Sequence, residues 1–341
     1  MLFSLNDKKA MFIINNKNNK GVINMNNFKK IGLSALAGSL VAFSANAGEM
    51  SVSGGANLYM TATNELNKTT WSNDDHVTFS GSGELDNGMT VTYSLQLDGD
   101  EADDGVIDNH SVTIDTGGMG TITYSGHGGD SVMSGMDDKT PNAYEEAFDG
   151  LTTSGSNQVI NGVSGNDLIR YDSESFSGAT IHLAIMPSSD TIANGGVYND
   201  YGITFKPEMV EGLEVGYAFG ETESTAGTPI DDSTIYLKYA IAGFTFGYQE
   251  SESDAASATN SDESKTVGVS YQVSDDFSVS YNTHEYNDGA WTTDEEFTGV
   301  SASYTMGGIT IAGHMNELEN KGGSATAADV EGYEINIGFA F

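Results

Sequence analysis

The 341-residue sequence contains no cysteine, four prolines and no long run of apolar residues beyond its first 47 positions. A chain without cysteine forms no disulfide, which suits an envelope protein but is also common among cytosolic proteins. No stretch after residue 47 reaches the 18 consecutive apolar residues that indicate a membrane-spanning helix. If this chain crosses a membrane, it must therefore do so with β-strands that form a barrel.

Basic residues are also scarce, with 13 Lys and Arg against 49 Asp and Glu. The first 47 residues hold six of the basic residues and one of the acidic ones. The remainder therefore carries 7 basic and 48 acidic side chains, a formal net charge of −41. Such a charge repels nucleic-acid phosphates and anionic lipid and attracts cations. Nucleic-acid binding is excluded as a function.

The first 47 residues are predicted to contain an export signal. A charged start at Met25 is followed by an apolar run over 31–43 and by small residues up to Ala47, the order found in signal peptides. The run is about 13 residues long, whereas a spanning helix needs about 20. We predict that translation starts at Met25 and cleavage follows Ala47. Residues 1–47 are then an N-terminal extension plus secretory signal peptide, and 48–341 the mature domain.

Apolar or small residues recur at every second position of the mature chain, first from Met50 to Met60. Successive side chains of a strand point to opposite faces, so this period predicts strands with one apolar and one polar face. The same alternation recurs at 77–79, 89–97, 112–114, 122–124, 169–171, 179–185, 203–205, 213–219, 235–239, 244–248, 267–273, 277–281, 300–304, 309–313 and 333–341. The count is sixteen.

Short and long connections alternate between these strands. Short turns, such as Asp86-Asn87-Gly88, carry hairpin signals. The long segments are acidic and cover 98–108, 221–232, 250–265, 284–296 and 316–329. Short periplasmic turns and long external loops give this rhythm. We predict an all-β transmembrane antiparallel barrel of about 16 strands around a water-filled lumen. A soluble β-sandwich is the alternative.

Residues 166–178, with the sequence NDLIRYDSESFSG, resemble the mid-barrel hairpin of the Gram-negative general (non-specific) porins of proteobacteria. In that family an Arg-Tyr-Asp-Ser tract precedes a Phe-x-Gly turn, and Pro usually stands where this chain has Glu174. The last strand resembles the terminal strand of outer-membrane proteins, which the barrel-assembly machinery recognises. The resemblance implies that Tyr333, Phe339 and Phe341 form this assembly signal.

The resemblance also implies function, location and partners. It implies an outer-membrane homotrimer, surrounded by outer-membrane lipid, that forms a passive channel for small hydrophilic solutes and ions, with no catalysis and no cofactor. Two other classes of protein stay open: a plugged outer-membrane barrel that acts as an adhesin or surface-structural protein, and an outer-membrane hydrolase. Conductance distinguishes the adhesin from the porin, and turnover of lipid or peptide would be needed for the hydrolase.

The longest connection, 126–165, is rich in acids and contains one basic residue, Lys139. In porins the third external loop folds into the barrel and narrows it, and the resemblance implies this role here. An ordinary exposed loop is the alternative. The predicted constriction acids are Asp130, Asp137, Asp138, Glu145, Glu146 and Asp149.

Arg170 is the only arginine, and it alternates with Ile169 and Tyr171, which predicts that it faces the lumen. Family porins set basic wall residues against the loop acids, so Arg170 is expected as the cationic wall. Lys206 and Lys238 have the same parity and are expected near the periplasmic mouth. Because basic residues are few and rings of carboxylates favour cations, we expect a cation-preferring pore. A purely structural role for Arg170 is the alternative.

Two weaker signals concern metals and catalysis. An acidic stretch could supply oxygen ligands for structural Ca²⁺, although it lacks the full calcium-loop pattern and a solvated loop is the alternative. Its residues are Asp98, Asp100, Asp103 and Asp104. The six histidines are scattered without metal-site spacing, and no nucleophile elbow is present. The sequence therefore does not predict an enzyme.

Overall fold

The computed structural model describes residues 48, 50–65, 68–99, 106–151, 160–187, 196–223, 229–255 and 261–341. Residues 46–341 form one compact unit. The predicted signal peptide lies outside the described residues. Within the described part no helix is long and apolar enough to cross a membrane.

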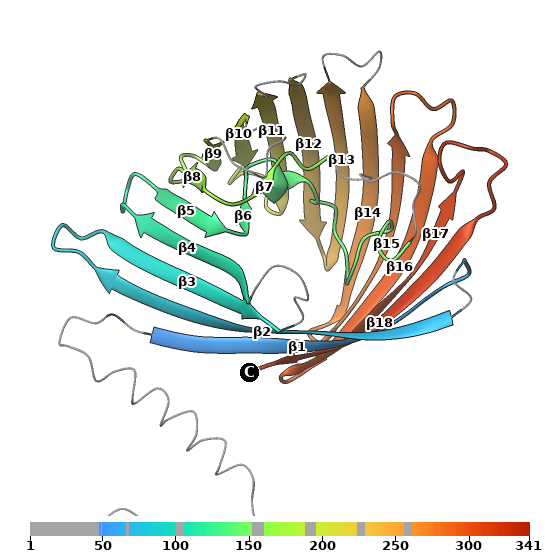
Figure 1. Cartoon of the computed structure of the whole chain (residues 1–341), viewed down its shortest axis with the longest axis horizontal. Coiled ribbons are helices and arrows are strands. Elements are labelled where there is room, and N and C mark those ends of the chain that lie inside the picture. The colour runs from blue at the N-terminus through green and yellow to red at the C-terminus, as the bar shows by residue number, and fades with distance from the viewer. Residues whose placement is uncertain are drawn as a thin grey trace, which may run out of the picture. The chain divides into compact units, whose positions relative to one another are not determined.

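Sixteen strands of the described chain close into an antiparallel barrel, as predicted, in which β1 pairs with β18 (Figure 1). They are β1 (Met50–Thr63), β2 (Lys68–Glu84), β3 (Thr90–Asp98), β4 (Ile107–Asp115), β5 (Thr121–His127), β8 (Leu168–Asp172), β9 (Ala179–Met186), β10 (Val197–Phe205), β11 (Leu213–Glu223), β12 (Ile230–Ile241), β13 (Phe244–Ala255), β14 (Asp262–Ser274), β15 (Phe277–Asn287), β16 (Glu295–Met306), β17 (Ile309–Glu319) and β18 (Val330–Ala340). A separate pair, β6 (Gly129–Asp130) and β7 (Ser164–Gly165), and the single turn η1 (Ser134–Met136) lie between β5 and β8.

Alternation along each strand separates a lipid-facing surface from an interior. On β12, for example, Ile235 and Leu237 are 47% and 44% exposed on the outer face, whereas Tyr236 between them is 2% exposed. In a closed barrel the backbone N–H and C=O groups of each strand are hydrogen-bonded to the neighbouring strands. Only the side chains of the lipid-facing side therefore need to be apolar. This explains how a chain with mean hydropathy of −0.29 can reside in a membrane.

Two-residue turns connect several strands at the short-turn end. Ala242 and Gly243 both have positive φ, at 51° and 83°, as do Ser177 and Gly178 at 50° and 86°. Two successive positive φ values define the hairpin turns whose twist matches that of the flanking strands. The Phe-x-Gly tract that suggested the porin resemblance is therefore one of these turns, closed by the pairing of Phe176 with Ala179.

The first strand of the barrel and the residue after its last strand are joined by backbone hydrogen bonds. Gly54 and Phe341 exchange two of them, from the Gly54 N–H to the Phe341 oxygen at 2.8 Å and from the Phe341 N–H to the Gly54 oxygen at 3.0 Å. The β1–β18 ladder continues from Gly55 to Thr63. The last residue thus takes part in closing the barrel.

The strands extend farther into the acidic segments than expected. Residues 250–265 were predicted as an external loop, yet β13 runs to Ala255 and β14 starts at Asp262, with Glu250 paired to Lys265. Parts of 221–232, 284–296 and 316–329 are likewise strand. Ladder hydrogen bonds form whatever the polarity of the side chains, so the alternation of apolar residues marks only the lipid-facing part of each strand.

This arrangement predicts that the same substitution has very different effects on the free energy of unfolding at two adjacent residues of β14. Val269 faces lipid between Phe246 and Tyr281, and Ser270 faces the interior. We expect Val269→Lys to lower the free energy of unfolding by about 2–4 kcal/mol. Ser270→Lys should change it by about 0.5 kcal/mol. Denaturant titration of both variants in lipid vesicles measures this, and equal losses would contradict the assigned faces.

Candidate functional site: the inward loop

The described part of the segment between β5 and β8 folds into the barrel, as the porin resemblance implied (Figure 1). Its two ends are tied together by the β6–β7 pair, where Gly129 lies opposite Gly165. Residues 131–151, here called the inward loop, then follow the inner wall from β8 to β18. The contacts below fall near the middle of the strands, so the loop lies within the lumen rather than above it.

The inward loop begins with an apolar anchor. Val132, Met133 and Met136 are buried against inner-wall side chains. The partners are Leu168, Ala184, Met186, Tyr198, Ala218 and Tyr236. Each fully buried aliphatic side chain contributes about 1.5–3 kcal/mol relative to exposure. The Asp200 carboxylate accepts a hydrogen bond from the Met133 N–H at 2.8 Å, which fixes the loop to β10.

Polar anchors continue along β13 to β17. The Gln249 side chain accepts from the Lys139 N–H at 2.8 Å, and two wall hydroxyls, of Ser280 and Ser301, accept from successive loop N–H groups at 3.0 and 3.1 Å. Farther along, the Asn316 amide donates to the backbone oxygens of Glu146 and Asp149 at 2.8 and 2.9 Å. These bonds satisfy backbone groups that the loop would otherwise bury without partners.

Glycines on the inner face leave room for the loop backbone. A Cβ at Gly247 would lie 2.3 Å from Pro141 Cδ, and one at Gly299 would lie 2.8 Å from Ala147 Cα. A Cβ at Gly202 or Gly332 would lie 2.7 or 2.9 Å from a loop side chain, and one at Gly220 or Gly268 would lie 3.2 Å from a loop atom. The loop therefore follows a row of wall positions that have no side chain, which we call the glycine track.

The far end of the loop packs in a second apolar cluster. Ala147 is buried among Tyr286, Phe297, Leu318 and Val330. Phe148 lies edge-on to the His284 ring, with centroids 4.8 Å apart. The loop is thus held at both ends by apolar packing and between them by hydrogen bonds.

The six predicted constriction acids all belong to the loop or its base. Asp137 and Asp138 line one hollow with Glu146, whereas Asp130 stands apart. Asp130 lies at the base, where its carboxylate accepts from the Ser134 hydroxyl at 3.4 Å. Glu145, Glu146 and Asp149 place their oxygens within 4.8 Å of one another, close enough for one hard divalent cation to contact all three.

Burial and crowding change the charge of these acids. Burial, followed by a hydrogen bond to Asp149, raises the pKa of Glu146 to about 10, so it is protonated at neutral pH. Burial and the neighbouring Asp149 raise the pKa of Glu145 to about 7. Burial and Asp138 do the same for Asp137, whose pKa is also about 7. The cluster therefore carries less negative charge than a count of its carboxyls suggests.

Arg170 has other partners than those expected of a cationic wall opposite the loop acids. Its Nη1 donates to the backbone oxygens of Ser131 at 3.0 Å and Asp130 at 3.4 Å, and its Nε and Nη2 contact the Asp172 carboxylate at 3.1 Å. The guanidinium is paired with a carboxylate of its own strand and binds the loop base. Alternation fixes which face a side chain occupies but does not reveal its partner, which explains the difference.

Lys206 and Lys238 lie at the short-turn end, Lys206 directly after β10 and Lys238 near the end of β12. Both contact Glu214 Oε2, at 3.3 and 3.8 Å. Of the expected wall residues, none forms an ion pair with a constriction acid among the described contacts. The five strands β1–β5 contain one Lys, Lys68, and no Arg.

The remaining predicted positions lie only partly within the described residues. Asp98 ends β3, whereas Asp100, Asp103 and Asp104 lie outside the described residues, so calcium binding there stays a prediction. Tyr333, Phe339 and Phe341 are on the outer face at 38%, 43% and 75% exposure.

Several residues that hold the loop were not foreseen. The Tyr144 hydroxyl donates to the Glu334 carboxylate at 2.6 Å, and its ring stacks on His314 with centroids 5.9 Å apart. Asn316 binds two loop carbonyls, as described above. Strand alternation in the sequence already places His314, Asn316 and Glu334 on the inner face. Their loop partners lie about 170–190 positions earlier in the chain, and contacts over such separations leave no local sequence signal.

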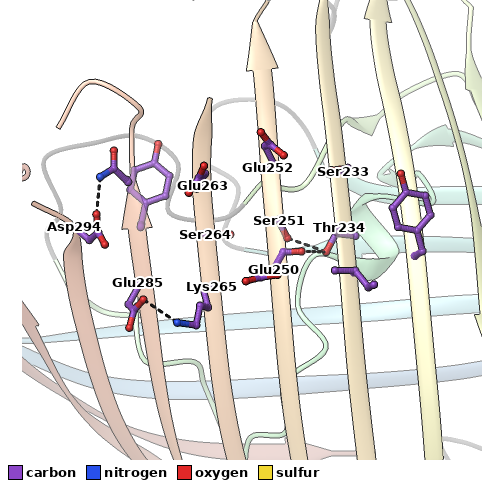
Figure 2. Close-up of a pocket in the computed structure, with 14 residues that line it drawn as sticks. Ser233, Thr234, Glu250, Ser251, Glu252, Glu263, Ser264, Lys265, Glu285 and Asp294 are labelled. Atoms are coloured by element: carbon purple, nitrogen blue, oxygen red, sulfur yellow. Dashed lines mark hydrogen bonds and ion pairs between the residues drawn. The ribbon is translucent and has the colours of Figure 1, made fainter. Parts of the chain in front are cut away.

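A second concentration of acids lies on strands, at the loop end of β12 to β15. Glu250, Lys265 and Glu285 are side by side in register, and a hollow of about 540 Å³ is lined by them and by neighbouring acids (Figure 2). The Lys265 ammonium contacts the Glu285 carboxylate at 3.3 Å. The negative charge of the chain is thus present on the barrel wall as well as in its loops.

Comparisons with known proteins agree with this architecture. A family model described as Gram-negative porin matches residues 32–323. No curated protein matches the sequence. Among solved structures, similar chains include a porin at 14% identity and TM-score 0.63, with 86% of this chain and 100% of that chain covered. OmpF of Salmonella typhi, in a complex with daunomycin, has 13% identity and TM-score 0.67, with 86% and 98% covered. The trimer form of OmpT from Vibrio cholerae has 13% identity and TM-score 0.63, with 87% and 100% covered.

The glycine track makes a steric prediction. Gly247→Ala would place its Cβ against Pro141, so the loop must move away from the wall and into the lumen. We expect single-channel conductance to fall while the barrel still folds. Gly83→Ala is the matched control, because its Cβ would meet nothing within 4 Å. Planar-bilayer recording measures both, and an unchanged conductance of Gly247→Ala would contradict this path of the loop.

Proposed function

This chain belongs to the Gram-negative porin family and forms an outer-membrane channel for small solutes, and we propose that the channel is passive and prefers cations. The observation that carries the proposal is the inward loop, which sets a cluster of carboxyls near mid-barrel. Porins are channel proteins rather than enzymes. A water-filled lumen suffices for diffusion, so no catalytic step or cofactor is needed.

The proposed selectivity follows from charge on the loop. Carboxylates that line a constriction favour cations. Strands β1–β5 contribute only Lys68 as a Lys or Arg residue, at the loop end of β2, so little positive charge opposes the acids. Because the pKa values of Asp137 and Glu145 are about 7, the constriction is expected to gain charge across the neutral range.

The proposed role of Arg170 is to hold the base of the inward loop. Its hydrogen bonds to Ser131 and Asp130 support this role, and its contact with Asp172 reduces its effect on the ion path. Lys206 and Lys238 would add weak positive charge at the periplasmic mouth, offset by Glu214.

We also propose that the native assembly is a homotrimer within outer-membrane lipid. Support comes from the similarity to a trimeric OmpT. The outward ring of Phe341 and its hydrogen bonds to Gly54 suit a terminal signal read by the assembly machinery before the barrel closes.

Cation selectivity should rise with pH. A carboxyl with a raised pKa is neutral below that value and charged above it, so Asp137 and Glu145 gain charge between about pH 5 and pH 9. A charge about 4 Å from the ion path contributes about 1 kcal/mol in water, or about fivefold in permeability ratio. Reversal potentials under a KCl gradient measure the ratio.

The double variant Asp137→Asn with Glu145→Gln provides the comparison. It should flatten the pH dependence and lower cation selectivity at pH 9. If the folded, membrane-inserted protein conducts no current, the proposal of an open channel is wrong and a plugged barrel is favoured.

Replacement of Arg170 tests its role at the loop base. Arg170→Met removes the bonds to Ser131 and leaves Asp172 without its guanidinium partner, and we expect a loss of about 1–3 kcal/mol in unfolding free energy and noisier open-channel current. Lys206→Met is the control, because it removes one cation without a bond to the loop. Equal current noise in the two variants would show that Arg170 does not hold the loop.

A further inference from the structure

Tyr144, in the second half of the inward loop, is held in one orientation by three contacts with the inner wall. Its N–H donates to the Ser301 hydroxyl at 3.1 Å, and its own hydroxyl donates to the Glu334 carboxylate at 2.6 Å. Its ring stacks on His314, a wall residue that is 4% exposed, with centroids 5.9 Å apart. Since the wall covers one face of the ring, the other face is turned away from the wall and toward the lumen. The half-buried Tyr144 is therefore a preorganised aromatic surface inside the barrel.

A second tyrosine, Tyr59, lies on the inner face of β1, the strand next to β18. It alternates with the outward Leu58 and is directly opposite Asn336, whose side chain is hydrogen-bonded to its hydroxyl. Glu334 is two positions before Asn336 on the same face of β18, which makes it a diagonal neighbour of Tyr59. The carboxylate that binds the Tyr144 hydroxyl thus adjoins tyrosines of two different elements.

Three carboxyls from three elements lie near the Tyr59 hydroxyl. Glu334 of β18, Asp74 of β2 and Glu145 of the inward loop are all within electrostatic range of it. Asp74 takes this position because it pairs with Asn57, one inward residue before Tyr59, and it accepts a hydrogen bond from the Asn57 amide at 3.3 Å. Two tyrosines and three carboxyls therefore face the same part of the lumen.

Lys and Arg are almost absent from the elements that carry these side chains. β1 and β18 contain neither residue type, and the only one in β2 is Lys68. Lys68 is roughly 20 Å from Asp74 along the extended strand. The one Lys of the inward loop, Lys139, acts on the carboxyls of Asp137 and Asp138 instead. A positive charge beside the two tyrosines is therefore expected from a solute.

The arrangement suits an ammonium group with carbon substituents better than a metal ion. Among the described residues, neither Asp74 nor Glu334 belongs to a group of carboxyls spaced to hold a metal ion. Their strands flank β1, so the two backbones lie roughly 10 Å apart. A methylated ammonium is larger than a metal ion and spreads its charge over its carbon atoms. It can therefore contact the face of a tyrosine ring while it remains in the field of the carboxylates.

We propose that Tyr59, Tyr144 and the carboxyls of Asp74, Glu145 and Glu334 form a subsite for solutes that carry a methylated ammonium group. The inference rests on the channel proposed above and names one class of solute for it. The tyrosine rings contact the methyl groups, and the carboxylates supply the negative field. A pore that responds to charge alone would instead bind choline and its unmethylated analogue, ethanolammonium, equally.

The test compares choline with ethanolammonium and with the neutral carbon isostere of choline. Each is added to the wild-type protein in a planar bilayer while the current carried by KCl is recorded. We expect choline to reduce this current in a saturable manner, at a concentration about two- to fivefold lower than ethanolammonium requires. This factor corresponds to a cation–π contact at an exposed site. The neutral isostere should leave the current unchanged.

Variants separate the contribution of the ring from that of the charge. Tyr59→Leu should remove the difference between choline and ethanolammonium, whereas Tyr59→Phe keeps the ring and should preserve it. Glu334→Gln removes a charge but keeps an acceptor for the Tyr144 hydroxyl, and it should raise the half-blocking concentration of both cations about fivefold. Glu84→Gln, at the short-turn end of β2, is the control and should change neither concentration. Heat-dependent gel mobility checks that each variant is folded.

Two results would overturn the subsite. One is an equal half-blocking concentration of choline and ethanolammonium in the wild-type protein, and the other is a difference between them that survives in Tyr59→Leu. A wild-type pore without cation preference in a KCl gradient would instead overturn the selectivity proposed for the channel. If the barrel conducts no current, saturation-transfer NMR from the detergent-purified protein to the choline methyl protons replaces the recording. Equal transfer in the wild type and in Tyr59→Leu would then overturn the subsite.

Discussion

The rest of the structure depends on the closed ladder of backbone hydrogen bonds. Within hydrocarbon an unpaired strand edge is costly, so the first and last strands must meet, and Gly54 and Phe341 complete that contact. Closure divides every strand into an outer and an inner face. The outer face carries the apolar side chains, and the inner face becomes a polar surface on which serines, Asn316 and Gln249 can bind a second layer of chain.

That second layer combines two opposing requirements. The inward loop must pack against the wall to stay in place, and packing removes its carboxyls from water. The pKa values of Asp137, Glu145 and Glu146 are raised as a consequence, because burial and neighbouring acids destabilise the charged form of a carboxyl relative to its protonated form. Stability of the loop and charge in the constriction therefore cannot be maximised together.

Periodicity in the sequence was sufficient for the barrel, the strand number and the face of Arg170, because each depends only on alternation along one strand. The inward path of the loop came from a family resemblance. What escaped prediction depends on contacts between distant residues: the Tyr144–Glu334 bond, the binding of Arg170 to the loop base and the protonation of Glu146. The acidic extensions of β13 and β14 escaped for a different reason, since polar strands outside the membrane resemble loops.

The glycine track has a consequence for the exchange of pore loops between barrels. The wall lacks side chains where the inward loop passes, at Gly202, Gly247 and Gly299 among others. The inner surface is therefore complementary in shape to one backbone path of the loop. A loop transplanted from another barrel would fit only if its route matched these recesses. Conversely, recesses mapped on a barrel with an unknown loop would reveal where that loop runs.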